Sequence, residues 1–250
     1  MSKPGRYGIE SVFSLSTLRP AYWKTLANLR ADRTSIAVDG ATLRFSNYLF
    51  TPASVFPNGA VAKGQIAEVN LAHPPQLRLV SGEILFVPHS GKTALMGFVN
   101  DNDIEIRARA AIWSALLDPF LDTWEEQDVI DRQFAWLASL GLERDAVDQW
   151  RREVAVSMIA YNFGTMLWEW GALDLHDALI AQQARLSRPA FRDFYWRAMR
   201  LTALDQLRPQ RLHSSPAKVG SALHSVLTDW YPRDRRTSAG DFTEHWERVK

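Results

Sequence analysis

The most apolar stretch of the chain runs from Asp148 to Trp170 and has the periodicity of an α-helix. Its larger side chains recur every three or four residues and form two adjacent faces. One face comprises Trp150, Val154, Met158, Tyr161 and Thr165, and the other comprises Ile159, Phe163, Met166 and Trp170. A helix that is apolar nearly all round must be covered nearly all round, which predicts the central helix of a helical bundle. Because charged residues close the stretch before it reaches the roughly 20 apolar residues of a membrane span, we expect no transmembrane segment.

Between residues 34 and 99 the pattern changes to short apolar runs separated by turn residues. Asp39-Gly40 between two such runs is a strong hairpin signal and predicts that Ser35–Val38 pairs with Thr42–Phe45. The further predicted strands are Ser54–Phe56, Ala60–Ala62, Ile66–Leu71, Leu77–Val80, Ile84–Val87 and Leu95–Val99. The gaps are too short for crossover helices, so the strands should pair antiparallel. We expect a small, strongly bent sheet or barrel of six or seven strands.

An amphipathic helix over Ile104–Trp124 is predicted to close this sheet, with Asp101 or Asp103 as its cap and a kink or end at Pro119. Several antiparallel strands followed by one helix resemble the element order of a pleckstrin-homology-like domain. The resemblance is one of element order and carries no functional residue to this chain.

Helical periodicity dominates the remaining chain. A short helix ending near Arg30 precedes the strands, and four more helices are predicted at Glu125–Leu140, Arg144–Trp170, Leu175–Leu186 and Pro189–Leu207. Their short connections favour antiparallel neighbours. The fold class is therefore predicted to be α+β, with a β-rich domain over residues 1–124, a helical domain over 125–207, and a basic C-terminal segment over 208–250.

Composition excludes several classes of function. The chain has 250 residues, 46% of them hydrophobic, a formal net charge of +1 and no cysteine. The missing thiols exclude disulfides, thiolate catalysis and cysteine-based metal sites. The N-terminus MSKPGRYGIE lacks an apolar signal core, so we expect a cytoplasmic protein. Nine of the ten tryptophans fall at or after position 113, which predicts an aromatic core or interface in the helical half.

One motif is similar to a phosphate-binding loop. Ser90-Gly91-Lys92-Thr93 follows a predicted strand, but a full phosphate loop needs glycine where this chain has Phe86. The motif should also lead into a helix, whereas Ala94–Val99 has the pattern of a strand. The sequence therefore favours a hairpin turn.

The candidate catalytic residues are Glu169, His176 and Asp177. Glu169 lies between two tryptophans, where a carboxylate can have a raised pKa and act as an acid or base, but at a helix end it can equally face water. Asp174, with Asp177 three residues on, has the spacing of an acidic capping box, which favours a structural role over a metal site. No histidine pair has metal-ligand spacing, so we predict no metal and no cofactor.

The C-terminal segment interleaves basic and aromatic side chains. The candidate binding residues are Trp230, Tyr231, Arg233, Arg235 and Arg236. Such a mixture suits a nucleic-acid strand or an anionic membrane surface. The competing interpretation, which we favour, is that this segment folds back on the acidic region of its own chain.

Three functional hypotheses follow from these patterns. The leading one is a non-enzymatic interaction or scaffold protein that binds a protein partner or itself, because the chain has a high aromatic content and no strong catalytic signature. The second is an enzyme or small-molecule binder with its pocket between the two halves. The third is contact with nucleic acid or a membrane surface through residues 208–250.

Overall fold

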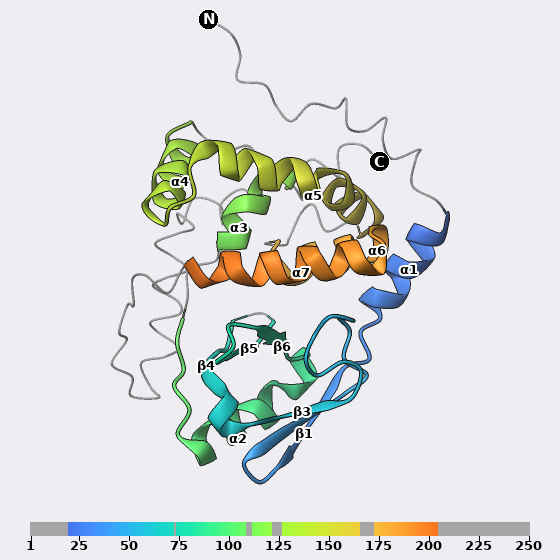
Figure 1. Ribbon diagram of the computed structural model, residues 1–250, viewed down its shortest axis with the longest axis vertical. Helices are drawn as coiled ribbons and strands as arrows, with labels where there is room; N and C mark the ends of the chain where they lie inside the picture. Colours follow the sequence, from blue (N-terminus) through green and yellow to red (C-terminus); the bar gives the residue numbers. More distant parts are fainter. Residues whose placement is uncertain (1–19, 73, 109–111, 122–126, 166–172, 205–250) are drawn as a thin grey trace, which may run out of the picture. The chain divides into compact units, whose positions relative to one another are not determined.

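The computed structural model describes residues 20–72, 74–108, 112–121, 127–165 and 173–204, in the order helix, strands, helices (Figure 1). The chain divides into the units Met1–Pro209 and Gln210–Lys250, and every described residue belongs to the first. The β elements are β1 (Ser35–Asp39), β2 (Thr42–Ser46), β3 (Gly59–Ala62), β4 (Ile66–Asn70), β5 (Gln76–Leu79) and β6 (Ile84–Phe86), and short 3-10 helices lie at η2 (Lys63–Gln65), η3 (His89–Gly91) and η4 (Asp118–Phe120). The helices are α1 (Pro20–Arg30), α2 (Lys92–Asn102), α3 (Ile112–Leu117), α4 (Gln127–Ser139), α5 (Arg144–Thr165), α6 (Leu175–Arg185) and α7 (Arg188–Thr202).

The predicted hairpin between β1 and β2 is confirmed, with its turn one residue later than expected. Asp39 pairs with Thr42, so Gly40 and Ala41 form a two-residue turn. Gly40 occupies the first turn position with a φ of 55°, a conformation that glycine adopts at little cost.

The described strands form two separate antiparallel sheets, β1-β2-β3 and β4-β5-β6, and the expected closed barrel is wrong. The reason is that both edges of the second sheet are occupied by other groups. On the β4 edge, Val69 exchanges backbone hydrogen bonds with residues 105–107. On the β6 edge, the amides of Ile84 and Phe86 donate to the Met199 sulfur and the Tyr48 hydroxyl. The likeness to a pleckstrin-homology-like domain is therefore not shown by this topology.

Two further predictions around residue 100 are wrong. The expected strand Leu95–Val99 lies in helix α2, because Leu95, Phe98 and Val99 stand at helical spacing and bury one face. Asp103, with a φ of 52°, ends that helix instead of beginning the next. Of the expected helix Ile104–Trp124, the described residues form helix only in α3 and η4, while Ile106 forms a parallel bridge with Val69.

The other predicted helices are present. α1, α4, α6 and α7 lie where the periodicity places them, and α5 carries the predicted central pattern as far as Thr165. Its residues Val154, Met158 and Tyr161 are buried as expected. Across the described ranges, no helix combines the length and the apolar character that crossing a bilayer requires.

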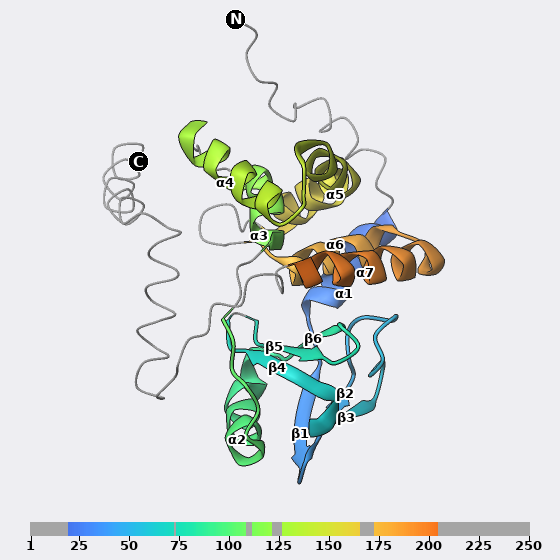
Figure 2. The ribbon, with the colours of Figure 1, turned by 60° about the vertical axis from the view of Figure 1, so that its left-hand side comes forward.

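One hydrophobic core connects the sheets and helices of the described part. It includes Phe45 in β2, Leu85 in β6, Met158 in α5 and Phe194 in α7. Helix α7 lies between the β4-β5-β6 sheet and helices α3, α4 and α5, next to α6, whereas α2 lies on the side of the strands (Figures 1 and 2). Among the described tryptophans, Trp113 is buried in this core, and Trp136, Trp150 and Trp196 pack against it. The rings of Trp113 and Trp150 meet edge to face 5.5 Å apart.

A buried carboxylate holds three elements of the first unit together. Glu83, in the turn before β6, is 1% exposed. Its Oε1 accepts a hydrogen bond from the Ser54 amide at 3.0 Å and another from the Tyr195 hydroxyl at 2.9 Å. The loop after β2, the second sheet and α7 are therefore fixed to one another through a single side chain.

Glycine 91 allows η3 to pack against β1, and we predict that Gly91→Ala destabilises the protein. A Cβ there would lie 2.9 Å from Ile36 Cγ1 and 3.0 Å from Val87 Cγ1. Overpacking of this kind costs about 1–3 kcal/mol, measurable by urea unfolding. The matched control is Gly97→Ala in α2, where a Cβ meets nothing within 4 Å. This substitution should raise the free energy of unfolding by up to about 1 kcal/mol, because alanine favours a helix more than glycine does. Equal stability of both variants would contradict the packing role.

Candidate functional site

The predicted capping box at the start of α6 is confirmed. The Asp174 carboxylate accepts hydrogen bonds from the amides of His176 and Asp177, at 2.7 and 3.4 Å. In return, the Asp174 amide donates to Asp177 Oδ2 at 2.9 Å. Both aspartates therefore have the structural role that their spacing indicates.

The second carboxylate oxygen of Asp177 is also engaged. Tyr161 donates its hydroxyl to Asp177 Oδ1 at 2.7 Å, which joins α5 to α6. Burial and the negative charge of Asp177 raise the pKa of the Tyr161 hydroxyl. Burial and the same negative charge also raise the pKa of the Asp174 carboxyl. The corner is thus a coupled acidic pair that stabilises a helix start.

His176 points into aromatic packing. Its ring centroid lies 5.6 Å from that of Phe50 and 5.0 Å from that of Phe86. Within the part of the chain that the structure describes, no three His, Cys, Asp or Glu side chains are placed to hold a metal ion. In the structure Asp177 is therefore part of the capping box and His176 packs against core aromatic rings. Glu169 lies outside the described residues.

The motif Ser90-Gly91-Lys92-Thr93 does lead into a helix, contrary to the expectation from its sequence. The other requirements of a phosphate loop are not met. Phe86 remains at the glycine position, and Lys92 Nζ donates to the Leu71 carbonyl at 3.2 Å. Gly91 faces Ile36, as described above, so the loop packs against β1.

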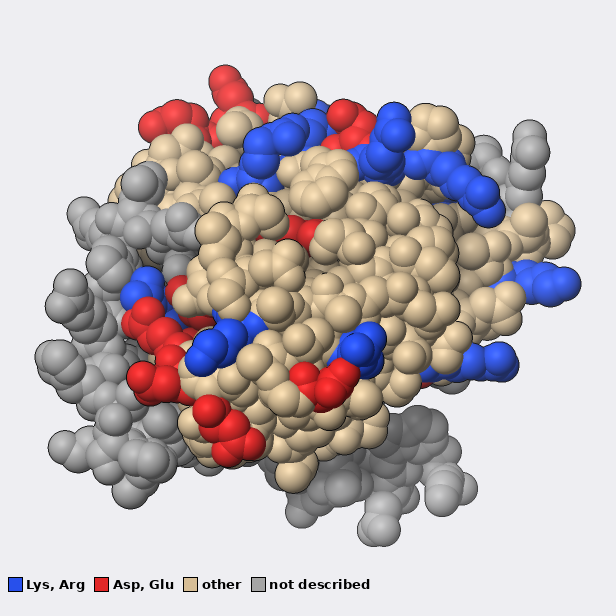
Figure 3. All heavy atoms as spheres, turned by 60° about the horizontal axis from the view of Figure 1, so that its bottom comes forward, with Lys and Arg blue, Asp and Glu red and all other residues tan. Residues whose placement is uncertain are grey.

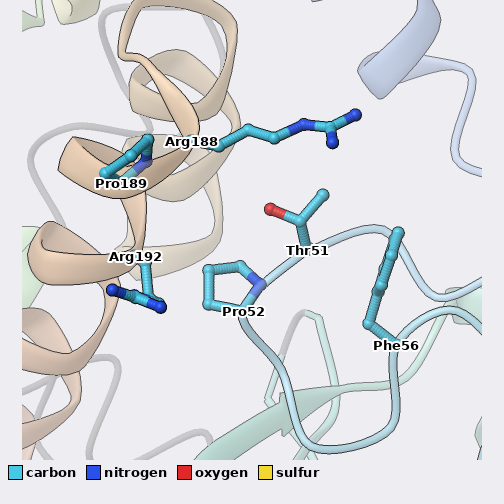
Figure 4. Close-up of a pocket in the computed structure, with 6 residues that line it drawn as sticks. All are labelled: Thr51, Pro52, Phe56, Arg188, Pro189 and Arg192. Carbon is cyan, nitrogen blue, oxygen red and sulfur yellow. The ribbon is translucent and has the colours of Figure 1, made fainter.

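A surface pocket lies between the loop after β2 and the beginning of α7 (Figure 4). Its volume is about 360 Å³, and its lining residues are Thr51, Pro52, Phe56, Arg188, Pro189 and Arg192. We call it the arginine pocket. Arg188 extends across it towards Thr51 and Phe56, while Arg192 lies one turn further along α7 beside Pro52 (Figure 4).

Both walls of the arginine pocket are held by hydrogen bonds to neighbouring elements. Gln183 in α6 donates to the Leu49 carbonyl at 2.9 Å and accepts from the Thr51 amide at 3.1 Å. The Glu83 carboxylate fastens Ser54, further along the same loop, to Tyr195 in α7. The pocket is therefore formed in advance of any ligand.

The charge of the arginine pocket is not neutralised within the described residues. Arg188 and Arg192 are exposed, stand four residues apart on one face of α7, and make no ion pair or hydrogen bond with another described residue. Further along the helix, Arg197 pairs with Glu153 and Asp193, which raises its pKa. Uncharged atoms dominate the face seen in Figure 3, and most of its acidic groups gather at one side.

Sequence reasoning missed this pocket because its walls come from residues more than 130 positions apart. The only local signal is the spacing of Arg188 and Arg192 around Pro189 at a helix start. The C-terminal binding candidates Trp230, Tyr231, Arg233, Arg235 and Arg236 lie outside the described residues. No protein-family model, curated protein or solved structure matches the chain.

The acidic corner generates a prediction about pH. Because the folded-state pKa of Asp174 is raised, the folded chain binds more protons, and stability should fall as pH rises from about 4 towards that pKa. Asp174→Asn keeps a good cap but cannot ionise, so its free energy of unfolding should fall less between pH 4 and 7. Urea unfolding across this range measures the difference.

The control for this prediction is Asp128→Asn. Asp128 is exposed and its pKa is lowered by Arg132, so its stabilising contribution is present at neutral pH and lost in acid. The loss falls below about pH 4, so between pH 4 and 7 the profile of Asp128→Asn should run nearly parallel to that of the unsubstituted protein. Parallel profiles of Asp174→Asn and the unsubstituted protein would show that ionisation of Asp174 does not destabilise the folded protein.

Proposed function

We propose that the protein is a non-enzymatic interaction protein that docks a partner protein in the arginine pocket. The observation that carries the proposal is a cavity lined by two arginines without a described partner and by the exposed ring of Phe56. Arginine and aromatic side chains are the residues most enriched in the energetic centres of protein interfaces.

The size of the pocket supports a partner's side chain as the ligand. Pockets for drug-sized molecules run from about 300 to 1,000 Å³, and this one is near the lower limit at about 360 Å³. It has room for one or two side chains of a partner. Phe56, which is 41% exposed, would lose much of its water contact on docking.

The described titratable groups support a binding role over catalysis. The carboxylates of Asp174 and Asp177 are used in capping, and the His176 ring packs against Phe50 and Phe86. None of these three residues lines the arginine pocket.

A small-molecule binder is the second candidate. One observation favours it: the arginine pocket is lined from both the β-rich and the helical part of the first unit, where ligand sites often lie. A free ligand of this size would have few heavy atoms and would leave no covalent protein adduct in a crosslinking experiment. The two candidates are therefore separable.

Site-specific photo-crosslinking tests the proposal. The analogue p-benzoylphenylalanine replaces Phe56 in the full chain, and in a control it replaces Val80, which is 71% exposed and does not line the pocket. We expect an adduct of defined mass from position 56 and none from position 80 after illumination in a cell extract. Excess unlabelled protein should suppress an adduct with a different protein but not an adduct with a second copy of the chain.

The mass of the adduct identifies the kind of partner. Twice the mass of the chain means self-association, and another mass means a different protein. Equal adducts from both positions, or none from either while both variants keep the native circular dichroism spectrum, would contradict the proposal.

A further inference from the structure

We infer that the arginine pocket recognises a carboxylate carried next to an aromatic or aliphatic side chain, as in an acidic peptide segment of a partner. This inference rests on the proposed function and adds the chemistry of the docking group. Its starting point is that all six lining residues are basic, uncharged polar or apolar, and none is acidic.

The first argument is charge. Arg188 and Arg192 stand one helical turn apart, where two like charges repel each other. No described carboxylate neutralises them, since the neighbouring Asp193 pairs with Arg197. In Figure 4 the two guanidinium groups point in different directions, so a carboxylate in the pocket would pair with one of them, and the planar fork of arginine suits bidentate carboxylate binding.

The second argument is the start of helix α7. Arg188 and Pro189 lie in its first turn, and the side chain of the N-cap residue Ser187 makes no capping hydrogen bond. The positive end of this 15-residue helix therefore faces the same region as the two arginines. An anionic group is stabilised there in addition to its pairing with the guanidinium groups.

The third argument is the apolar lining. Pro52, Pro189 and the exposed ring of Phe56 contribute surfaces that a carboxylate alone would not cover. A ligand that carries an apolar group next to its carboxylate would cover this apolar surface and pair with an arginine at the same time. Nucleic acid fits less well, because two arginines beside apolar surface fall short of the basic stripe that follows a phosphate backbone.

Peptide titration tests this inference on the isotope-labelled full-length chain. The probe is the dipeptide acetyl-Asp-Phe-amide, and its neutral match is acetyl-Asn-Phe-amide. We expect the acidic dipeptide to shift the nuclear magnetic resonance signals of Thr51 and Phe56, and to bind about tenfold more tightly than the neutral one. Its affinity should fall as salt is added.

Substitutions that remove charge locate the effect. Arg188→Gln combined with Arg192→Gln should remove the preference for the acidic dipeptide. The matched control is Arg200→Gln, an exposed arginine of the same helix that does not line the pocket, and it should retain the preference.

The possible outcomes separate the two proposals. Equal binding of both dipeptides at Phe56 would overturn the carboxylate inference and leave partner docking intact. Binding of a single-stranded oligonucleotide that depends on Arg188 and Arg192, without binding of the acidic dipeptide, would also overturn it. Absence of shifts at Thr51 and Phe56 with either dipeptide overturns the inference, whereas only the crosslinking experiment decides whether a partner docks.

Discussion

The buried carboxylate of Glu83 is the interaction on which the arrangement of the first unit depends. Its Oε1 joins the Ser54 amide to the Tyr195 hydroxyl at a position withdrawn from water. A buried polar group without partners is costly, and the hydrogen bonds that offset the cost form only when the loop, the sheet and α7 are all present. Apolar packing alone would tolerate small displacements of α7, whereas these directional bonds fix its position.

The hydrogen bonds of Glu83 also shape the arginine pocket. Gln183 holds the beginning of the loop and Glu83 holds its middle, so Thr51 and Phe56 face α7 at a fixed separation. The cavity needs no ordering step before a ligand enters, and binding energy is not spent on arranging the loop.

Local patterns predicted local structure well. The capping box of Asp174, the hairpin at Gly40 and the amphipathic helices each depend on residues a few positions apart. The predictions that failed depended on distant partners: the barrel could not close because Met199 and Tyr48 fill one sheet edge. Short apolar runs such as Leu95–Val99 are ambiguous between strand and helix until burial on one face decides. The arginine pocket is assembled from segments far apart in sequence, so no motif could show it.

The distance along the chain between Glu83 and Tyr195 also has a consequence during synthesis. The two residues are separated by 112 positions. At ribosomal rates of about 5–20 residues per second, the sheet waits roughly 6–22 s for the helix that covers it. During that interval the nascent protein exposes the apolar side chains of β6, and water takes the place of the Tyr195 hydroxyl at the Glu83 carboxylate. The ribosome-bound intermediate therefore exposes apolar surface that α7 later covers.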